Sequence, residues 1–205
     1  MSGIKCFFMD PTENERIWLR RYNGNDKCAV AEHGYHQSWV FFGDRHRVPS
    51  CYGHDVDAEP EMLPHDDPRW PSSCRCSYIF TDDDNWQMFN SRLYRRCDNQ
   101  ELVTLREAPV GAMWYAKWMP KNMYWDNKED VDHLMVRLPD GTDWCVDSRC
   151  NNCTLPNDRL HRCWVRTGTP PYVTVGKEGF TCSAGAGSVQ SPGWHGYLRN
   201  GELVV

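Results

Sequence analysis

The sequence predicts an α+β fold, with mostly antiparallel β-sheet, one main amphipathic helix and zinc-stabilised loops. Three observations lead to this class. Alternating apolar and polar runs flank turn residues in both halves of the chain, one segment has helical spacing, and Cys and His residues gather in loops. The 205 residues are enough to bury a core, and we expect a single compact domain over 1–205, with 1–105 and 106–205 as the alternative division.

Two segments near the N-terminus predict β-strands. Residues 15–22 alternate loosely in hydrophobicity and end at an Asn-Gly pair, which is typical of a strand that runs into a turn. Residues 38–42, with the sequence SWVFF, form a second short apolar run. We therefore expect the N-terminal part of the chain to be rich in β-structure.

One segment, residues 83–97, predicts the main helix. Trp86, Phe89 or Asn90, Leu93 and Cys97 recur at spacings of three and four, so that they would share one helical face. Aspartates at its start would cap the helix, and two arginines near its end would complement the helix dipole. We expect this amphipathic helix to pack on a sheet.

The C-terminal half predicts β-hairpins. Residues 133–147 form two alternating runs around a Pro-Asp-Gly turn, and residues 196–205 flank an Asn-Gly turn in the same way. The run WVRTGTPPYVTV at 164–175 predicts two further strands. Strands joined by such short turns favour an antiparallel sheet.

The composition argues against several classes of protein. The net charge is -5, whereas a sequence-independent coat for nucleic acid needs an excess of Lys and Arg. The cations are nevertheless 17 Arg and 6 Lys, and local Arg clusters leave a specific phosphate or nucleic-acid site as an alternative. Mean hydropathy is -0.72 and no apolar run approaches ~18 residues, so we expect neither a membrane span nor a secretory signal, and a cytoplasmic location.

The clearest cluster of potential metal ligands is Cys150-x2-Cys153-x7-His161-x-Cys163. Zn²⁺ prefers four N or S ligands in a tetrahedron, and a C-x2-C turn followed by H-x-C can supply them. The Pro-Asn-Asp sequence between the two halves favours a turn that brings them together. The alternative is that Cys153 and Cys163 are ordinary core thiols and His161 is a hydrogen-bonded surface residue.

A second predicted zinc site combines Cys51-x2-His54 with Cys74-x-Cys76. The acidic, Pro-rich segment between the two pairs has almost no periodicity, and such a long loop is uncommon unless its ends are tied down, for example by a metal. A catalytic role for His65 in this segment is the less favoured interpretation.

The trio Cys28, His33 and His36 is a weaker candidate, because only its H-x2-H spacing supports a metal site and core or surface placement is favoured.

The segment MWYAKWMPKNMYW is unusually rich in aromatic residues and contains Trp114, Trp118 and Trp125. Core packing is the simpler explanation. The alternative is an exposed aromatic platform that binds a partner protein, a sugar or an unstacked base, because such surfaces favour Trp and Tyr.

Enzyme signatures are weak in this sequence. The motifs GxxxxGK[ST], GxGxxG, HExxH, GxSxG and HxE…PCxxC are absent. The remaining candidate nucleophile is Cys182, which precedes small residues whose N–H groups could bind an oxyanion, with His195 or His161 as the base. Cys182 is also a candidate fourth ligand for the Cys153, His161 and Cys163 group.

Four blocks of the sequence carry a resemblance to a known family. They are LPHDDPRWPSSCRCSYIF, APVGAMWYAKWM, DSRCNNCTLPNDRLHRCWVRTGTPP and GFTCSAGAGSVQSPGWHGYLRNGEL, which together span most of residues 60–203. The chain resembles a family of small Cys- and Trp-rich proteins encoded by tailed bacteriophages. The resemblance implies a viral origin and no particular activity. Members of this family more often carry a non-Cys residue where this chain has Cys150, so the resemblance weakens Cys150 as a ligand and makes Cys182 the alternative ligand.

Three classes of function follow. We favour a phage-encoded, zinc-stabilised binding protein that acts in the cytoplasm of the infected host cell on a host or viral protein, with nucleic acid as the less favoured partner. The first alternative is a Cys/His-dependent or metal-dependent enzyme centred on Cys182 and His195. The second is a structural component of the virion.

Overall fold

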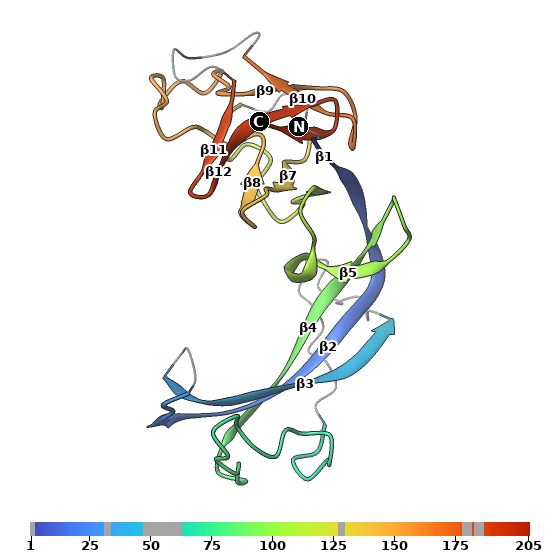
Figure 1. The fold of residues 1–205 in the computed structure, drawn as a ribbon, viewed down its shortest axis with the longest axis vertical. Coiled ribbons are helices and arrows are strands. Elements are labelled where there is room, and N and C mark those ends of the chain that lie inside the picture. Colours follow the sequence, from blue (N-terminus) through green and yellow to red (C-terminus); the bar gives the residue numbers. More distant parts are fainter. Residues whose placement is uncertain (1–2, 31–33, 47–62, 127–129, 178–181, 183–186) are drawn as a thin grey trace. The chain divides into compact units, whose positions relative to one another are not determined.

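The computed structural model describes residues 3–30, 34–46, 63–126, 130–177, 182 and 187–205. Its elements in chain order are β1 (Ile4–Lys5), β2 (Phe7–Lys27), β3 (Tyr35–His46), β4 (Asn85–Arg96), β5 (Leu102–Thr104), the 3₁₀ turn η1 (Leu105–Glu107), β6 (Ala112–Tyr115), β7 (Leu134–Arg137), β8 (Asp143–Cys145), β9 (Val165–Thr167), β10 (Thr174–Gly176), β11 (Val189–Ser191), β12 (Trp194–Arg199) and β13 (Glu202–Val204) (Figure 1). In these ranges the chain contains no helix that is long and apolar enough to cross a membrane.

The chain divides into two compact units. We call Met1–Asp10 with Arg95–Val205 the terminal unit, because it contains both ends of the chain, and Pro11–Tyr94 the inserted unit. Each unit has a hydrophobic core of its own, and each is described separately below.

The predicted α+β class is wrong: the described residues form an all-β structure whose only helical segment is the 3₁₀ turn η1. The predicted helix at 83–97 is strand β4. Trp86 and Met88 pack on the core with Ile17, and Asn90 Nδ2 donates to Glu15 Oε2 at 2.9 Å. Residues two apart therefore share a face, as in a strand rather than a helix.

Two features of the sequence explain this difference. The segment is rich in aromatic residues, which favour strands, and one of its two partner strands, β2, is distant in sequence, so that no local signal reveals that pairing. The aspartate that would cap a helix instead closes a turn before the strand, because Asp84 Oδ2 accepts from the Thr81 N–H at 2.7 Å.

In the inserted unit, β2 and β3 form a long antiparallel hairpin, and β4 lies on the other side of β2 (Figure 1). The predicted strands at 15–22 and 38–42 are confirmed as parts of β2 and β3. Alternate residues of β2 face the core of this unit, which consists of Ile17, Leu19, Trp70 and Met88. The hairpin brings the end of β2 close to the start of β3.

The predicted C-terminal hairpins are confirmed in the terminal unit. β7 pairs with β8 in antiparallel orientation, β9 with β10, and β12 with β13. The tight β12–β13 turn has positive φ angles at Asn200 (46°) and Gly201 (75°), as expected of an Asn-Gly turn. The side chains of these strands enclose the main core: Met113, Leu134, Val136, Leu138, Trp144, Val146, Val173, Val175, Val189, Leu198 and Leu203.

Candidate metal centres

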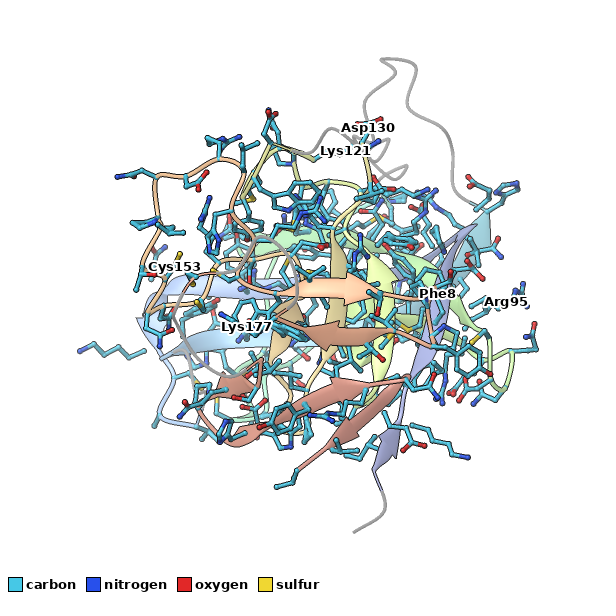
Figure 2. All side chains as sticks on the ribbon, turned by 90° about the horizontal axis from the view of Figure 1, so that it is seen from above. Phe8, Arg95, Lys121, Asp130, Cys153 and Lys177 are labelled. Atoms are coloured by element: carbon cyan, nitrogen blue, oxygen red, sulfur yellow. The ribbon has the colours of Figure 1, made fainter. Side chains whose placement is uncertain are left out.

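Cys153, His161, Cys163 and Cys182 form the first Cys/His group, which lies in the terminal unit. One ligand atom from each residue lies within 4.8 Å of all the others. His161 and Cys163 are 2% exposed, and Cys182 is also buried. The first three residues come from the irregular segment between β8 and β9, where Figure 2 labels Cys153. The group is therefore assembled by a loop and closed by a residue from further along the chain.

Local hydrogen bonds hold the Cys153 loop in place. The Cys153 N–H donates to the Cys150 carbonyl at 3.1 Å, and the Leu155 N–H approaches Cys153 Sγ at 3.4 Å. Arg149 stabilises the loop, because its guanidinium donates hydrogen bonds to the carbonyl oxygens of Leu155 and Asp158. This Arg is thus a structural part of the loop that presents the thiol.

His161 is poised as a ligand rather than as a hydrogen-bonded surface residue. Its Nε2 lies 3.3 Å from Cys163 Sγ, while its buried Nδ1 has no hydrogen-bond partner. Burial raises the pKa of Cys163 well above its ordinary value. Without a cation this thiol stays protonated, and a metal ion would have to displace that proton when it binds.

Cys150 lies beside this group but is not one of its four members. It is half-buried, packs against Cys163 and Cys182, and burial raises the pKa of its thiol. The four-membered group in the structure is the set with Cys182 as the alternative to Cys150. Cys150 also lines a cavity of about 690 Å³ together with Cys163 and Trp164.

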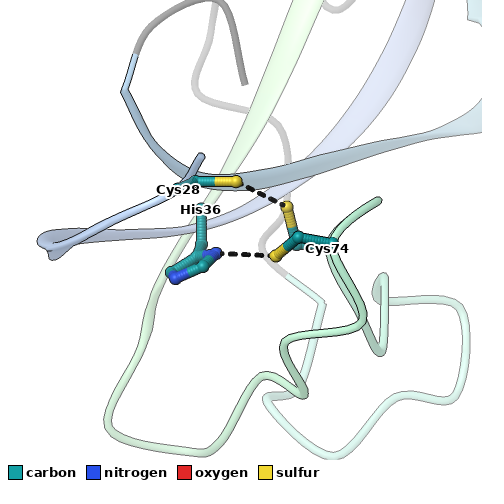
Figure 3. A group of neighbouring side chains, drawn as sticks. Cys28, His36 and Cys74 are labelled. Carbon is teal, nitrogen blue, oxygen red and sulfur yellow. Dashed lines mark hydrogen bonds between the residues drawn. The ribbon is translucent and has the colours of Figure 1, made fainter. Parts of the chain in front are cut away.

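Cys28, His36, Cys74 and Cys76 form the second Cys/His group, in the inserted unit. Their ligand atoms again lie within 4.8 Å of one another. Cys28 follows β2 and His36 lies in β3, so the hairpin supplies both, and the Cys28 N–H donates to the Gly34 carbonyl at 3.0 Å. Figure 3 shows Cys28, His36 and Cys74 turned toward one another.

Cys74 and Cys76 reach this group from a tight turn. The Cys74 N–H donates to the Tyr78 carbonyl at 2.9 Å, and the Ser77 N–H donates to the Cys74 carbonyl at 3.0 Å. Ser77 has a φ of 72°, which bends the chain so that both thiols face the hairpin. The turn therefore presents two sulfur ligands to one point.

The electrostatics of this second group favour a thiolate. Burial opposes ionisation of Cys74, but hydrogen bonds from the Cys76 N–H and from His36 outweigh it and lower the Cys74 pKa to about 6. The His36 ring stacks on Tyr78 with centroids 4.2 Å apart. The Tyr78 hydroxyl in turn accepts from Asn23 at 2.9 Å and donates to Asp84 at 3.3 Å. This network orients the ring as outer-sphere contacts orient metal ligands.

The donor sets of both groups fit a tetrahedral zinc ion. Zn–S bonds of ~2.3 Å and Zn–N bonds of ~2.0 Å require S–S edges of roughly 3.8 Å and S–N edges of roughly 3.5 Å. The Cys28 and Cys74 sulfur atoms lie 3.9 Å apart, and Cys76 Sγ lies 3.1 Å from His36 Nδ1. The described cysteines form no disulfide bonds with one another. Two Cys₃His groups compatible with structural zinc are thus built into the chain.

The structure rearranges the second predicted zinc site. Cys74 and Cys76 meet Cys28 and His36, for which the sequence favours core or surface placement. Cys51, His54 and His33 lie outside the described residues. The sequence carries one signal for this group: seven residues separate Cys28 from His36, the same spacing as between Cys153 and His161.

The remaining predicted site residues are dispersed. Trp114 and Trp125 are buried, at 1% and 3% exposure, whereas Trp118 is 61% exposed, so the three do not form one open platform. The candidate nucleophile Cys182 belongs to the first Cys/His group. The candidate base His195 lies in β12, where its Nε2 is 3.0 Å from Ser188 Oγ.

Comparison with known proteins identifies neither of these two groups. No protein-family model, no curated protein and no solved structure matches this chain.

Proposed function

We propose that this chain is a binding module in which each compact unit is held together by one structural zinc ion. The observation that carries the proposal is the pair of Cys₃His groups, one in each unit. Four protein ligands complete a tetrahedral shell and leave no position for a substrate or a reactive water, which is typical of structural rather than catalytic zinc.

The loops that carry the ligands support this role. Within the described ranges, residues 146–164 contain no strand, and residues 63–84 contain only the isolated bridge between Ser73 and Ile79. Such segments gain little from sheet hydrogen bonds. A zinc ion that links them to the hairpin or to Cys182 offsets the entropy of ordering them, because metal binding and folding are coupled.

The phage resemblance and the lack of disulfide bonds among the described cysteines support a setting for the module. Free thiols persist in a reducing compartment, such as the cytoplasm of an infected bacterium. There the module would bind a host or viral macromolecule rather than catalyse a reaction.

Elemental analysis of the native full-length chain, purified in reducing buffer, tests the proposal. We expect two zinc ions per chain. Cys163→Ser and Cys74→Ser should each lose one of them, and the matched control Cys97→Ser should lose none, because Cys97 is exposed and belongs to neither group. A metal-free wild-type chain, or variants with unchanged zinc content, would overturn the proposal.

A further inference from the structure

We propose that one face of the β2–β3–β4 sheet binds single-stranded nucleic acid by stacking bases on its aromatic rings. We call this surface the aromatic face; its rings are Trp18, Tyr22, Tyr35, Trp39, Phe41 and Phe89. This inference names the partner of the binding module proposed above and rests on that function, although it uses a surface distinct from the zinc groups.

The alternation of β2 separates the aromatic face from the core. Glu15, Ile17, Leu19 and Arg21 are all less than 9% exposed and point to one side of the strand. The residues between them point to the opposite side. Along β2, the inserted unit therefore buries one face of the strand and turns the other outward.

The register of the hairpin brings the rings together across strands. Trp18 lies opposite Phe41, with ring centroids 5.5 Å apart. The ring centroids of Trp39 and of Phe89 in β4 are 4.9 Å apart. Trp39 and Phe41 remain 40% and 52% exposed. These rings come from three neighbouring strands of one unit, β3, β2 and β4, whose order can be followed in Figure 1.

A cation lies among these rings. The Arg20 guanidinium lies 4.3 Å from the centre of the Tyr22 ring, and it is 5.1 Å from that of Trp39. It donates to the Tyr35 hydroxyl and to Gln37 Oε1, and its buried Nε has no hydrogen-bond partner. Among the described residues, no carboxylate forms an ion pair with it. This positive charge is therefore available to a phosphate.

A second arginine extends the face, although it is already paired. Arg16 lies 5.6 Å from the centre of the Phe41 ring and donates to Asp44 at 2.9 Å. The aromatic face therefore carries a small positive charge. This fits a short contact with few phosphates in a protein whose net charge is -5.

The chemistry of the face favours nucleic acid over a protein partner. The outward positions 16, 18, 20 and 22 of β2 and 35, 37, 39 and 41 of β3 hold aromatic, Arg and Gln residues and no aliphatic side chain. Every base has a π-face that stacks on such rings, whereas protein interfaces also pack aliphatic side chains. Same-face residues along a strand are spaced about 7 Å apart, so separate rings can receive separate bases.

Fluorescence anisotropy of the full chain with labelled oligothymidine and oligouridine of about 12 nucleotides tests the proposal. We expect saturable binding, and a duplex of the same length should not compete, because its bases are already stacked. Comparing the affinities for the two oligomers shows whether the surface prefers single-stranded DNA or single-stranded RNA. Binding should also quench the fluorescence of the unmodified protein, since Trp18 and Trp39 lie on the aromatic face.

Two substitutions probe the rings, and a third probes the charge. Phe41→Ala and Trp39→Ala should each weaken binding roughly tenfold or more. Arg20→Gln should lower the slope of log affinity against log salt by about 0.7. The matched control Trp118→Ala removes a Trp of the terminal unit that is even more exposed than Trp39, and it should leave affinity unchanged.

Retained zinc content and circular dichroism establish that each variant is folded. No binding by a zinc-loaded wild-type chain would overturn this inference and leave the metal-stabilised module intact. Equal affinity in wild type, Phe41→Ala and Trp39→Ala would also overturn it, as would equal affinity for duplex. Binding by a chain that holds no zinc would support this inference while refuting the zinc proposal.

Discussion

Replacing Cys163 by serine separates a metal ligand from an ordinary buried thiol. Serine is close to cysteine in size but binds zinc poorly, so the change removes a ligand while leaving the cavity nearly filled. Cys163 is 2% exposed and lies 3.3 Å from His161 Nε2. If it is only a core residue, the substitution should lower the free energy of unfolding by about 1–3 kcal/mol.

A structural metal predicts a larger loss. Structural zinc contributes an apparent binding free energy of about 10–16 kcal/mol, which rivals the entire stability of a domain at about 5–15 kcal/mol. We therefore expect Cys163→Ser to lose more than about 4 kcal/mol in the terminal unit. The irregular segment 146–164 should open first, because no strand holds it, and Trp164, which packs on Trp144 with centroids 5.5 Å apart, should become exposed.

Hydrogen exchange measured by mass spectrometry resolves this loss along the chain. Protection should fall over 146–164 in Cys163→Ser and persist in the inserted unit, whereas Cys74→Ser should show the opposite pattern. Chelator should reproduce both patterns in the wild-type chain. A loss of only about 1–3 kcal/mol, with protection of 146–164 unchanged, would refute the zinc account of this loop.

Three further predictions concern the terminal unit. Gly201→Ala should destabilise it by about 1–3 kcal/mol in urea unfolding, because φ is +75° and a Cβ would lie 2.4 Å from the Pro171 carbonyl oxygen. Leu198→Ala should cost about 2–5 kcal/mol in the same assay, because Leu198 is fully buried in the main core. The hydrogen bond with Ser191 lowers the pKa of Asp140, so this carboxylate stabilises the fold fully above pH 3.8, and the contribution is lost as the pH falls from 3.8 through the lowered pKa. Thermal unfolding of Asp140→Asn should therefore show a weaker loss of stability than wild type as the pH falls below 3.8.

Specific results would contradict each of these. An unchanged urea midpoint for Gly201→Ala would mean that the β12–β13 turn differs from the one described. A loss below about 1 kcal/mol for Leu198→Ala would place that side chain outside the core. Identical acid profiles for Asp140→Asn and wild type would remove the carboxylate from the pH dependence.

The sequence determines the features that depend on neighbouring residues. The hairpins β7–β8 and β12–β13 follow from turn residues between alternating runs, because such a turn fixes the register of both flanking strands. The grouping of Cys153, His161 and Cys163 follows in the same way from spacing within one loop. These contacts form between residues that are close in sequence, so only a short segment of the chain has to become ordered for each of them.

Only the tertiary structure decides contacts between distant segments. Cys28 and Cys74 meet although 46 positions separate them, and Cys182 completes the other group from beyond β10. The helix predicted at 83–97 is strand β4. Pairing within the sheet overrides the helix-like spacing of apolar residues that the sequence shows there. The aromatic face likewise exists only once β2, β3 and β4 are side by side. Strand pairing joins residues that no local pattern connects, and the second Cys/His group and the proposed binding surface depend on it, whereas the first group depends on the packing of a loop against Cys182.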